Sequence, residues 1–193
     1  MGSSYDQVSL FPTVVHVLEV DNFRDIDQQL INFAYKCRKE SPGRIVSNVG
    51  GWQSHVMGVD DDPIDRVLLD TIINLPIKST SAKITKWINI NSPGSFNSTH
   101  VHSGSHLSGV FWIKCPCKSG DLILDSPFNF SSYDEMKNYE DDFKFKNNIY
   151  ETYKLFPQEG KIVIFPSHIH HEVSANLSKD DRISVAFNLN FDA

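Results

Sequence analysis

Histidines gather in two short segments of this sequence, and their spacing suits metal binding. Six of the eight histidines lie there: His100, His102 and His106 in the first segment, and His168, His170 and His171 in the second. Residues two apart in an extended segment point to the same side, so His100 and His102 can both reach one ion. Imidazole suits Fe, Zn, Cu or Ni, and a third ligand from a distant strand would complete a facial set with open positions. A His-rich loop without metal is the alternative, and it is favoured for His106 and His168.

The second segment offers more than one candidate for the third ligand. If the chain turns after residue 165 and re-enters a sheet, His171 lies on one face and His170 on the other. Only one of these faces can point to the metal. The spacing alone does not choose between them.

An arginine further along the chain could bind an anion. Arg182 opens a clean strand pattern, and Ser184 lies two residues later on the same face. Such a pair can hold a carboxylate through charge-assisted hydrogen bonds. The alternative is a surface arginine paired with Asp180 or Asp181.

The first part of the chain is expected to support these segments. Residues 13–20 are β-branched and apolar, which is typical of a strand. From 22 to 39, apolar residues recur at steps of three and four, which predicts an amphipathic helix. A second helix is expected to begin at Pro63, behind an acidic segment, and to end before Pro76.

The remainder of the chain is typical of strands and turns. Strands are predicted at 82–91, 107–114, 121–124, 161–165 and 182–191. In the last of these, the odd positions are apolar and form a core face, so the even positions form a wet or functional face. Residues 126–150 lack a period and are expected to be an insertion or lid, with a short helix around 133–138.

Together these elements predict one α+β, mainly β domain over residues 1–193. Residues 1–80 form a helical support region, and residues 81–193 form a sheet sandwich or barrel that contains the insertion.

Composition narrows the class of protein. The 193 residues carry a formal net charge of −6, which disfavours nucleic acid and acidic membranes as partners. There is no secretory start and no apolar stretch of about 18 residues or more, so a membrane fate is not expected. The three cysteines do not form a disulfide framework, and we therefore expect a reducing, cytoplasmic location.

Several segments, taken in order, resemble the 2-oxoglutarate/Fe(II)-dependent oxygenase superfamily. They are residues 91–102, 108–112, 160–167, 171–173 and 182–184, with 47–54 upstream. Within the superfamily, they are most similar to small oxygenases of bacteria and phages that are related to prolyl 4-hydroxylases.

The resemblance implies a double-stranded β-helix, also called a jelly roll or cupin-like fold, that holds Fe(II). It maps the metal ligands to His100, His102 and His171, and the grip on 2-oxoglutarate to Arg182 with Ser184. The implied reaction is a hydroxylation that consumes O2 and releases succinate and CO2.

One position departs from the superfamily pattern, because the usual His-x-Asp motif has His102 in place of the aspartate. Either His102 binds the metal, or a nearby carboxylate such as Asp121 or Asp125 completes the site. The histidine pair is usual in the branch that this sequence resembles, which favours a functional variant.

Two alternatives come from other functional classes. One is a three-histidine Zn(II) hydrolase, in which Glu172 or a nearby aspartate acts as base, but it leaves Arg182 without a role. The other is a non-catalytic jelly-roll binding module. The substrate could be a peptidyl side chain or a small molecule, and the protein could be a monomer or a homodimer.

Overall fold

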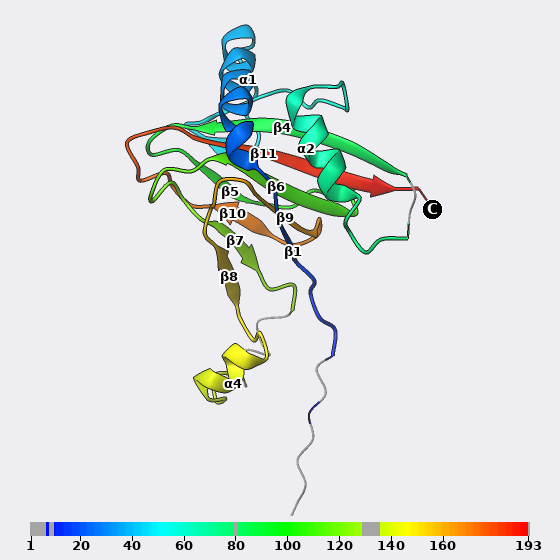
Figure 1. The fold of residues 1–193 in the computed structure, drawn as a ribbon. Coiled ribbons are helices and arrows are strands. Elements are labelled where there is room, and N and C mark those ends of the chain that lie inside the picture. Colours follow the sequence, from blue (N-terminus) through cyan, green and yellow to red (C-terminus); the bar gives the residue numbers. More distant parts are fainter. Residues whose placement is uncertain (1–6, 8–9, 79–80, 129–135, 193) are drawn as a thin grey trace, which may run out of the picture.

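Two antiparallel sheets lie face to face in the computed structural model, which describes residues 7, 10–78, 81–128 and 136–192 (Figure 1). The six-stranded sheet has the order β1 (His16–Glu19), β9 (Lys161–Pro166), β6 (Leu107–Lys114), β11 (Arg182–Phe191), β4 (Ala82–Asn91) and β3 (Trp52–Gln53). The five-stranded sheet has the order β2 (Asn48–Val49), β5 (Phe96–His100), β10 (His171–Val173), β7 (Leu122–Asp125) and β8 (Thr152–Leu155). This is the mainly β, double-stranded β-helix architecture that was expected.

The two faces of the six-stranded sheet have different neighbours because side chains alternate along each strand. The outer face packs against the helices and forms the larger core, to which β11 contributes Ile183, Val185, Phe187 and Leu189. The inner face forms a smaller cluster with the five-stranded sheet, including Trp112 and Phe165. The even positions of β11 therefore point into the space between the sheets.

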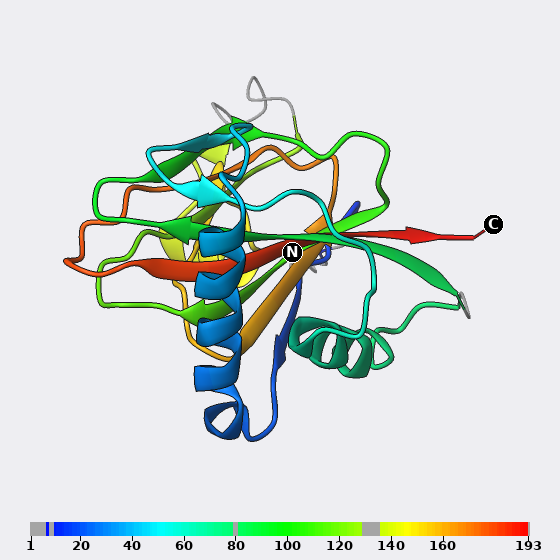
Figure 2. The ribbon, with the colours of Figure 1, turned by 90° about the horizontal axis from the view of Figure 1, so that it is seen from above.

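Two helices cover the outer face of the six-stranded sheet, as Figures 1 and 2 show. The predicted helix at 22–39 is a short 3-10 turn, η1 (Phe23–Asp25), followed by α1 (Asp27–Glu40). The second helix is α2 (Pro63–Ile72), and the Asp62 side chain caps it by accepting from the backbone of Ile64 and Asp65.

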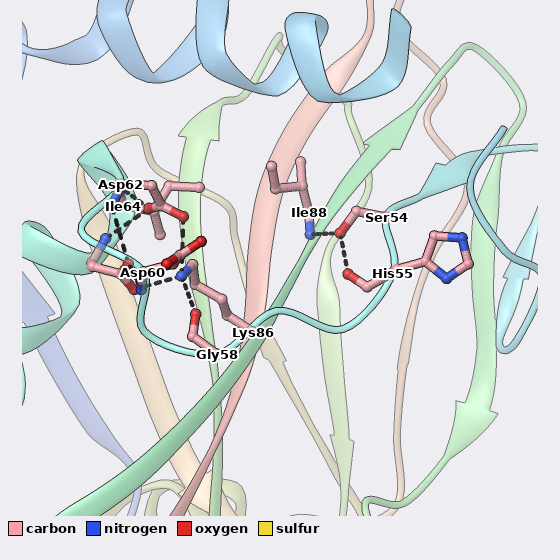
Figure 3. A network of polar contacts seen from close by, with 9 residues as sticks. Ser54, His55, Gly58, Asp60, Asp62, Ile64, Lys86 and Ile88 are labelled. Carbon is pink, nitrogen blue, oxygen red and sulfur yellow. Dashed lines mark hydrogen bonds and ion pairs between the residues drawn. The ribbon is translucent and has the colours of Figure 1, made fainter. Parts of the chain in front are cut away.

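A buried ion pair attaches α2 to the sheet. Lys86 of β4 is fully buried, and its Nζ donates to Asp65 Oδ1 at 2.5 Å, Asp62 Oδ2 at 3.0 Å and the Gly58 carbonyl at 2.7 Å (Figure 3). Asp62 and Asp65 therefore both stabilise the start of α2 and pair with Lys86.

The strand predictions for 82–91, 107–114 and 182–191 match β4, β6 and β11. Residues 126–150 connect β7 to β8 and carry α4 (Asp141–Lys146), which lies away from the two sheets (Figure 1). Half of the short helix expected at 133–138, residues 133–135, lies outside the described residues. Among the described helices, none has the length and apolar character that a membrane span requires.

Candidate metal centre

The three candidate ligand histidines lie together at one end of the five-stranded sheet. His100 ends β5 and His171 begins β10, and the two residues are partners in the antiparallel register. His102 follows two residues after β5. One ring nitrogen from each histidine lies within 4.8 Å of the others, and the ring centroids are 4.3 to 5.1 Å apart.

Each ring is oriented through its Nδ1 atom. Nδ1 lies 2.7 Å from the Ser98 carbonyl oxygen in His100 and 2.9 Å from the Ile169 carbonyl oxygen in His171. A carbonyl only accepts, so both Nδ1 atoms carry hydrogen and both Nε2 atoms keep their lone pairs. Such second contacts are typical of histidines that bind metals.

Burial keeps these imidazoles neutral. It lowers the pKa of His102 to about 4 and that of His171 to about 3, and it also lowers the pKa of His100. A metal ion needs the neutral imidazole, so no proton has to leave before it binds near neutral pH.

The other histidines and the candidate carboxylates lie outside this cluster. His170 is exposed, and its carbonyl accepts from the backbone of Asp125. His106 accepts from the backbone of Phe191 and stacks on its ring, as a structural histidine does. Neither Asp121 nor Asp125 belongs to the metal-ligating group found among the described residues.

Arg182 is a buried cation that lines one cavity together with the three histidines. Its side chain is 1% exposed and donates from Nη1 to the carbonyls of Ser119 at 3.1 Å and Gly120 at 3.3 Å, while Nε has no partner among the described residues. Burial lowers its pKa to about 10, so it stays charged at neutral pH. The surface pairing considered above is wrong, because Asp181 pairs with Arg38 instead.

Ser184 and several polar residues that the sequence analysis missed line this cavity with Arg182. Asn89 of β4 lines the cavity and is the register partner of Ser184. Asn91, the register partner of Arg182, is buried beside it but is not one of the lining residues. The Oδ1 atoms of Asn89 and Asn91 are buried without a hydrogen-bond partner among the described residues. The sequence feature that could have identified these two asparagines is the alternation of amides with isoleucines in residues 88–91, which places the amides on the face opposite the core.

The sequence matches a described family over more than half of its length. Residues 85–188 match the family described as "Putative 2OG-Fe(II) oxygenase". No match was found among curated proteins.

Solved structures of similar fold include two prolyl hydroxylases and the protein HygX. A prolyl-4-hydroxylase from Pseudomonas putida has a TM-score of 0.61 at 13% identity, with 94% of each chain covered. HygX from Streptomyces hygroscopicus, with nickel and 2-oxoglutarate bound, has a TM-score of 0.57 at 10% identity, covering 92% of this chain and 83% of HygX. A Trichoplax adhaerens prolyl hydroxylase, in complex with a hypoxia-inducible-factor peptide fragment, has a TM-score of 0.57 at 13% identity with the same coverages.

Proposed function

Because the chain belongs to the 2OG-Fe(II) oxygenase family, we propose that His100, His102 and His171 bind its Fe(II) and that Arg182 with Ser184 binds its 2-oxoglutarate. The cofactors and the enzyme class, an oxygenase that depends on both, follow from the family. The assignment of each residue to a cofactor is the proposal.

The observation that carries the metal assignment is the three-histidine cluster. Its imidazoles come from two strands and a loop, and burial keeps them neutral. Imidazole is a good ligand for iron, and three ligands leave positions open for other groups. Because none of the three ligands carries a negative charge, the bound metal ion would keep its full positive charge and attract an anionic partner strongly.

The fit to 2-oxoglutarate depends on Arg182. A buried guanidinium with no ion pair among the described residues, and with Nε unpartnered, lacks the anion that would compensate its charge. The side chain of Ser184 lines the same cavity and can donate from its hydroxyl. A carboxylate placed there would accept charge-assisted hydrogen bonds.

The protein residues position and shield the reaction. When bound, iron and 2-oxoglutarate would supply the oxidising chemistry with O2 as the oxidant, and succinate and CO2 would be the products. The histidines hold the metal on one side, and Arg182 holds the cosubstrate from the other sheet. Trp87 and Phe165 line the cavity and contact His102 and His171 respectively, so they limit access of water to the site.

We expect the group that is oxidised to be uncharged and to belong to a peptidyl side chain or a small molecule. Apart from Arg182 and the three histidines, every residue that lines the cavity is uncharged. If the cosubstrate carboxylate binds Arg182, no other charged side chain among the described residues that line the cavity remains for the substrate. The Trichoplax adhaerens neighbour was solved with a peptide fragment, which makes peptides the first class to test.

The decisive experiment is an anaerobic titration of the metal-free protein with Fe(II) and then 2-oxoglutarate. We expect a weak visible charge-transfer band, which His171→Ala abolishes and Arg182→Ala weakens. His170→Ala and Arg66→Ala are matched controls, since both residues are exposed, and they should leave the band unchanged.

The same titration, together with a titration of the metal-free protein with Zn(II), tests the alternatives. Absence of the band together with tight Zn(II) binding would support the hydrolase, and absence of both would support a non-catalytic module. Succinate formation with peptides and small molecules added in turn would then identify the substrate class.

A further inference from the structure

His102 differs from the other two histidines in what orients it. His100 and His171 each contact a backbone carbonyl two residues earlier on their own segment. The Nδ1 atom of His102 instead lies 2.7 Å from Asn188 Oδ1 and 2.8 Å from Ser108 Oγ. Both partners are side chains of the opposite, six-stranded sheet, where Asn188 of β11 and Ser108 of β6 are register partners.

The hydrogen bonds around Asn188 have one consistent direction. Asn188 Oδ1 can only accept, and it receives the Ser108 hydroxyl at 2.9 Å. Ser108 Oγ lies 2.7 Å from the hydroxyl of Ser167, which can donate to it, and both serines are buried. The remaining donor to the amide oxygen is Nδ1–H of His102, so Nε2 of that ring keeps its lone pair.

We propose that Asn188 is a positioning residue that fixes the tautomer and the orientation of His102, so that Nε2 faces the other two histidines. This inference rests on the proposed function, in which all three histidines bind iron. An imidazole can bind a metal through either nitrogen, and the hydrogen bond at one nitrogen decides which is free. Ser108 and Ser167 hold the amide in place.

The Asn188 side chain is an amide, and this affects the charge beside the metal ligands. A carboxylate at position 188 would also accept from Nδ1–H, but it would place negative charge beside the metal ligand. Asn188 fixes the ring without adding charge. The ligand set therefore stays neutral, and the metal keeps its full attraction for the carboxylate of the cosubstrate.

The first test is a tautomer measurement on the metal-free protein. Long-range ¹H–¹⁵N spectra of protein with labelled histidine report which ring nitrogen carries hydrogen, with the His102 signals assigned by comparison with His102→Gln. We expect the Nδ1–H form of His102 in the wild type and a mixture of both forms in Asn188→Leu. A wild-type ring in the Nε2–H form would overturn the inference, whatever the variants do.

The second test is metal affinity, measured with Co(II) by its visible spectrum. Asn188→Leu should weaken binding about 10- to 100-fold, as loss of a second contact to a metal-binding histidine does. Asn188→Asp retains an acceptor oxygen and should restore both the tautomer and most of the affinity. Asn190→Leu is the matched control, because it changes the next residue on the same face of β11.

Failure of this inference and failure of the proposed function give different results. If the wild type binds Co(II) and 2-oxoglutarate, and Asn188→Leu binds the metal equally well with an unchanged tautomer, the positioning role is wrong and the proposed function stands. If the wild type binds neither, the proposed function itself fails.

Discussion

In the proposed function, Arg182 is a buried charge whose partner is the cosubstrate and not a group of the free protein. Its only hydrogen bonds among the described residues go to the Ser119 and Gly120 carbonyls, and it forms no ion pair there. Removing a guanidinium from water costs free energy that carbonyl contacts recover only in part. The arginine is therefore expected to be compensated mainly when the cosubstrate is bound.

This predicts opposite effects of Arg182→Met on stability and on binding. Methionine fills a similar volume without charge, so the free energy of unfolding without 2-oxoglutarate should stay level or rise by up to about 2 kcal/mol. Affinity for 2-oxoglutarate should fall by at least about 100-fold, because two or more charge-assisted hydrogen bonds are lost. Urea unfolding and calorimetric titration measure the two effects. A marked loss of stability in the free variant would show that the arginine is paired before the cosubstrate binds.

Much of the candidate site could be predicted from residue spacing. His100 and His102 are close in sequence, so their shared direction follows from an extended backbone alone. The choice of His171 over His170 came only from the resemblance. Asn188 lies on the face of 182–191 that was expected to be wet or functional, but its role and that of Ser108 were missed, because their meeting depends on the register of two strands distant in sequence.

At the scale of elements, the buried cation that attaches α2 to β4 is paired with carboxylates, unlike Arg182. Lys86 is also a fully buried cation, but it lies between the carboxylates of Asp62 and Asp65 (Figure 3). Asp65 is itself 2% exposed and accepts from the backbone of Asp60 and Asp62 as well. Removing the lysine leaves a buried carboxylate without its counter-ion.

We therefore expect Lys86→Met to be strongly destabilising. Breaking a buried pair by removing one partner costs about 3 to 5 kcal/mol, so the free energy of unfolding should fall by that amount. Lys83→Met, on the same strand but exposed, is the matched control and should change it little. Urea unfolding at neutral pH gives both values. Equal stability of the two variants would mean that the ion pair contributes nothing to the attachment of α2.

The same ion pair predicts how stability depends on acid. Burial alone would raise the pKa of Asp65, but the hydrogen bond from Lys86 and those from the backbone of Asp60 and Asp62 lower it. The unfolded chain therefore binds the proton more readily, and the stabilisation present above about pH 4 is lost as the pH falls toward the folded pKa. Asp65→Asn should be less stable than the wild type near neutrality and show a shallower loss in acid. Parallel curves for the two proteins would rule out this role.

Long strands could be predicted from the sequence with their bounds, and the shorter strands β7 and β9 within one residue, whereas β2, β3 and β8 were not predicted. The strands β4, β6 and β11 have eight to ten residues and alternate clearly, so their bounds matched. Strands β2 and β3 have two residues each. They are defined by hydrogen bonding to a neighbouring strand and not by an alternation of apolar residues in the sequence. Strand β8 was missed because three of its four residues are exposed, so no apolar alternation marks it.

At the scale of the whole molecule, the histidine cluster joins the two sheets. His100 and His171 belong to the five-stranded sheet, while His102 is held through Asn188 and Ser108 of the six-stranded sheet. A metal bound by all three would link both sheets. Binding to the folded state alone stabilises the fold by about 2.7 kcal/mol when the free metal is 100 times its dissociation constant. That every residue of the chain belongs to one domain remains a prediction, which a single unfolding transition with and without metal would support.

The neutral histidines at this junction also make the metal-free fold sensitive to mild acid. The pKa values of His102 and His171, about 4 and about 3 in the fold, compare with 6.5 for an unperturbed histidine. Since the unfolded chain binds these protons first, stability should be complete above about pH 6.5 and fall by about 2 kcal/mol per histidine by about pH 5. Urea unfolding of the metal-free protein across this range measures the loss, which His171→Gln should reduce by the share of one histidine, about 2 kcal/mol. A flat wild-type profile would mean that the cluster takes up protons while folded, and the three imidazoles would then not be kept neutral for a metal.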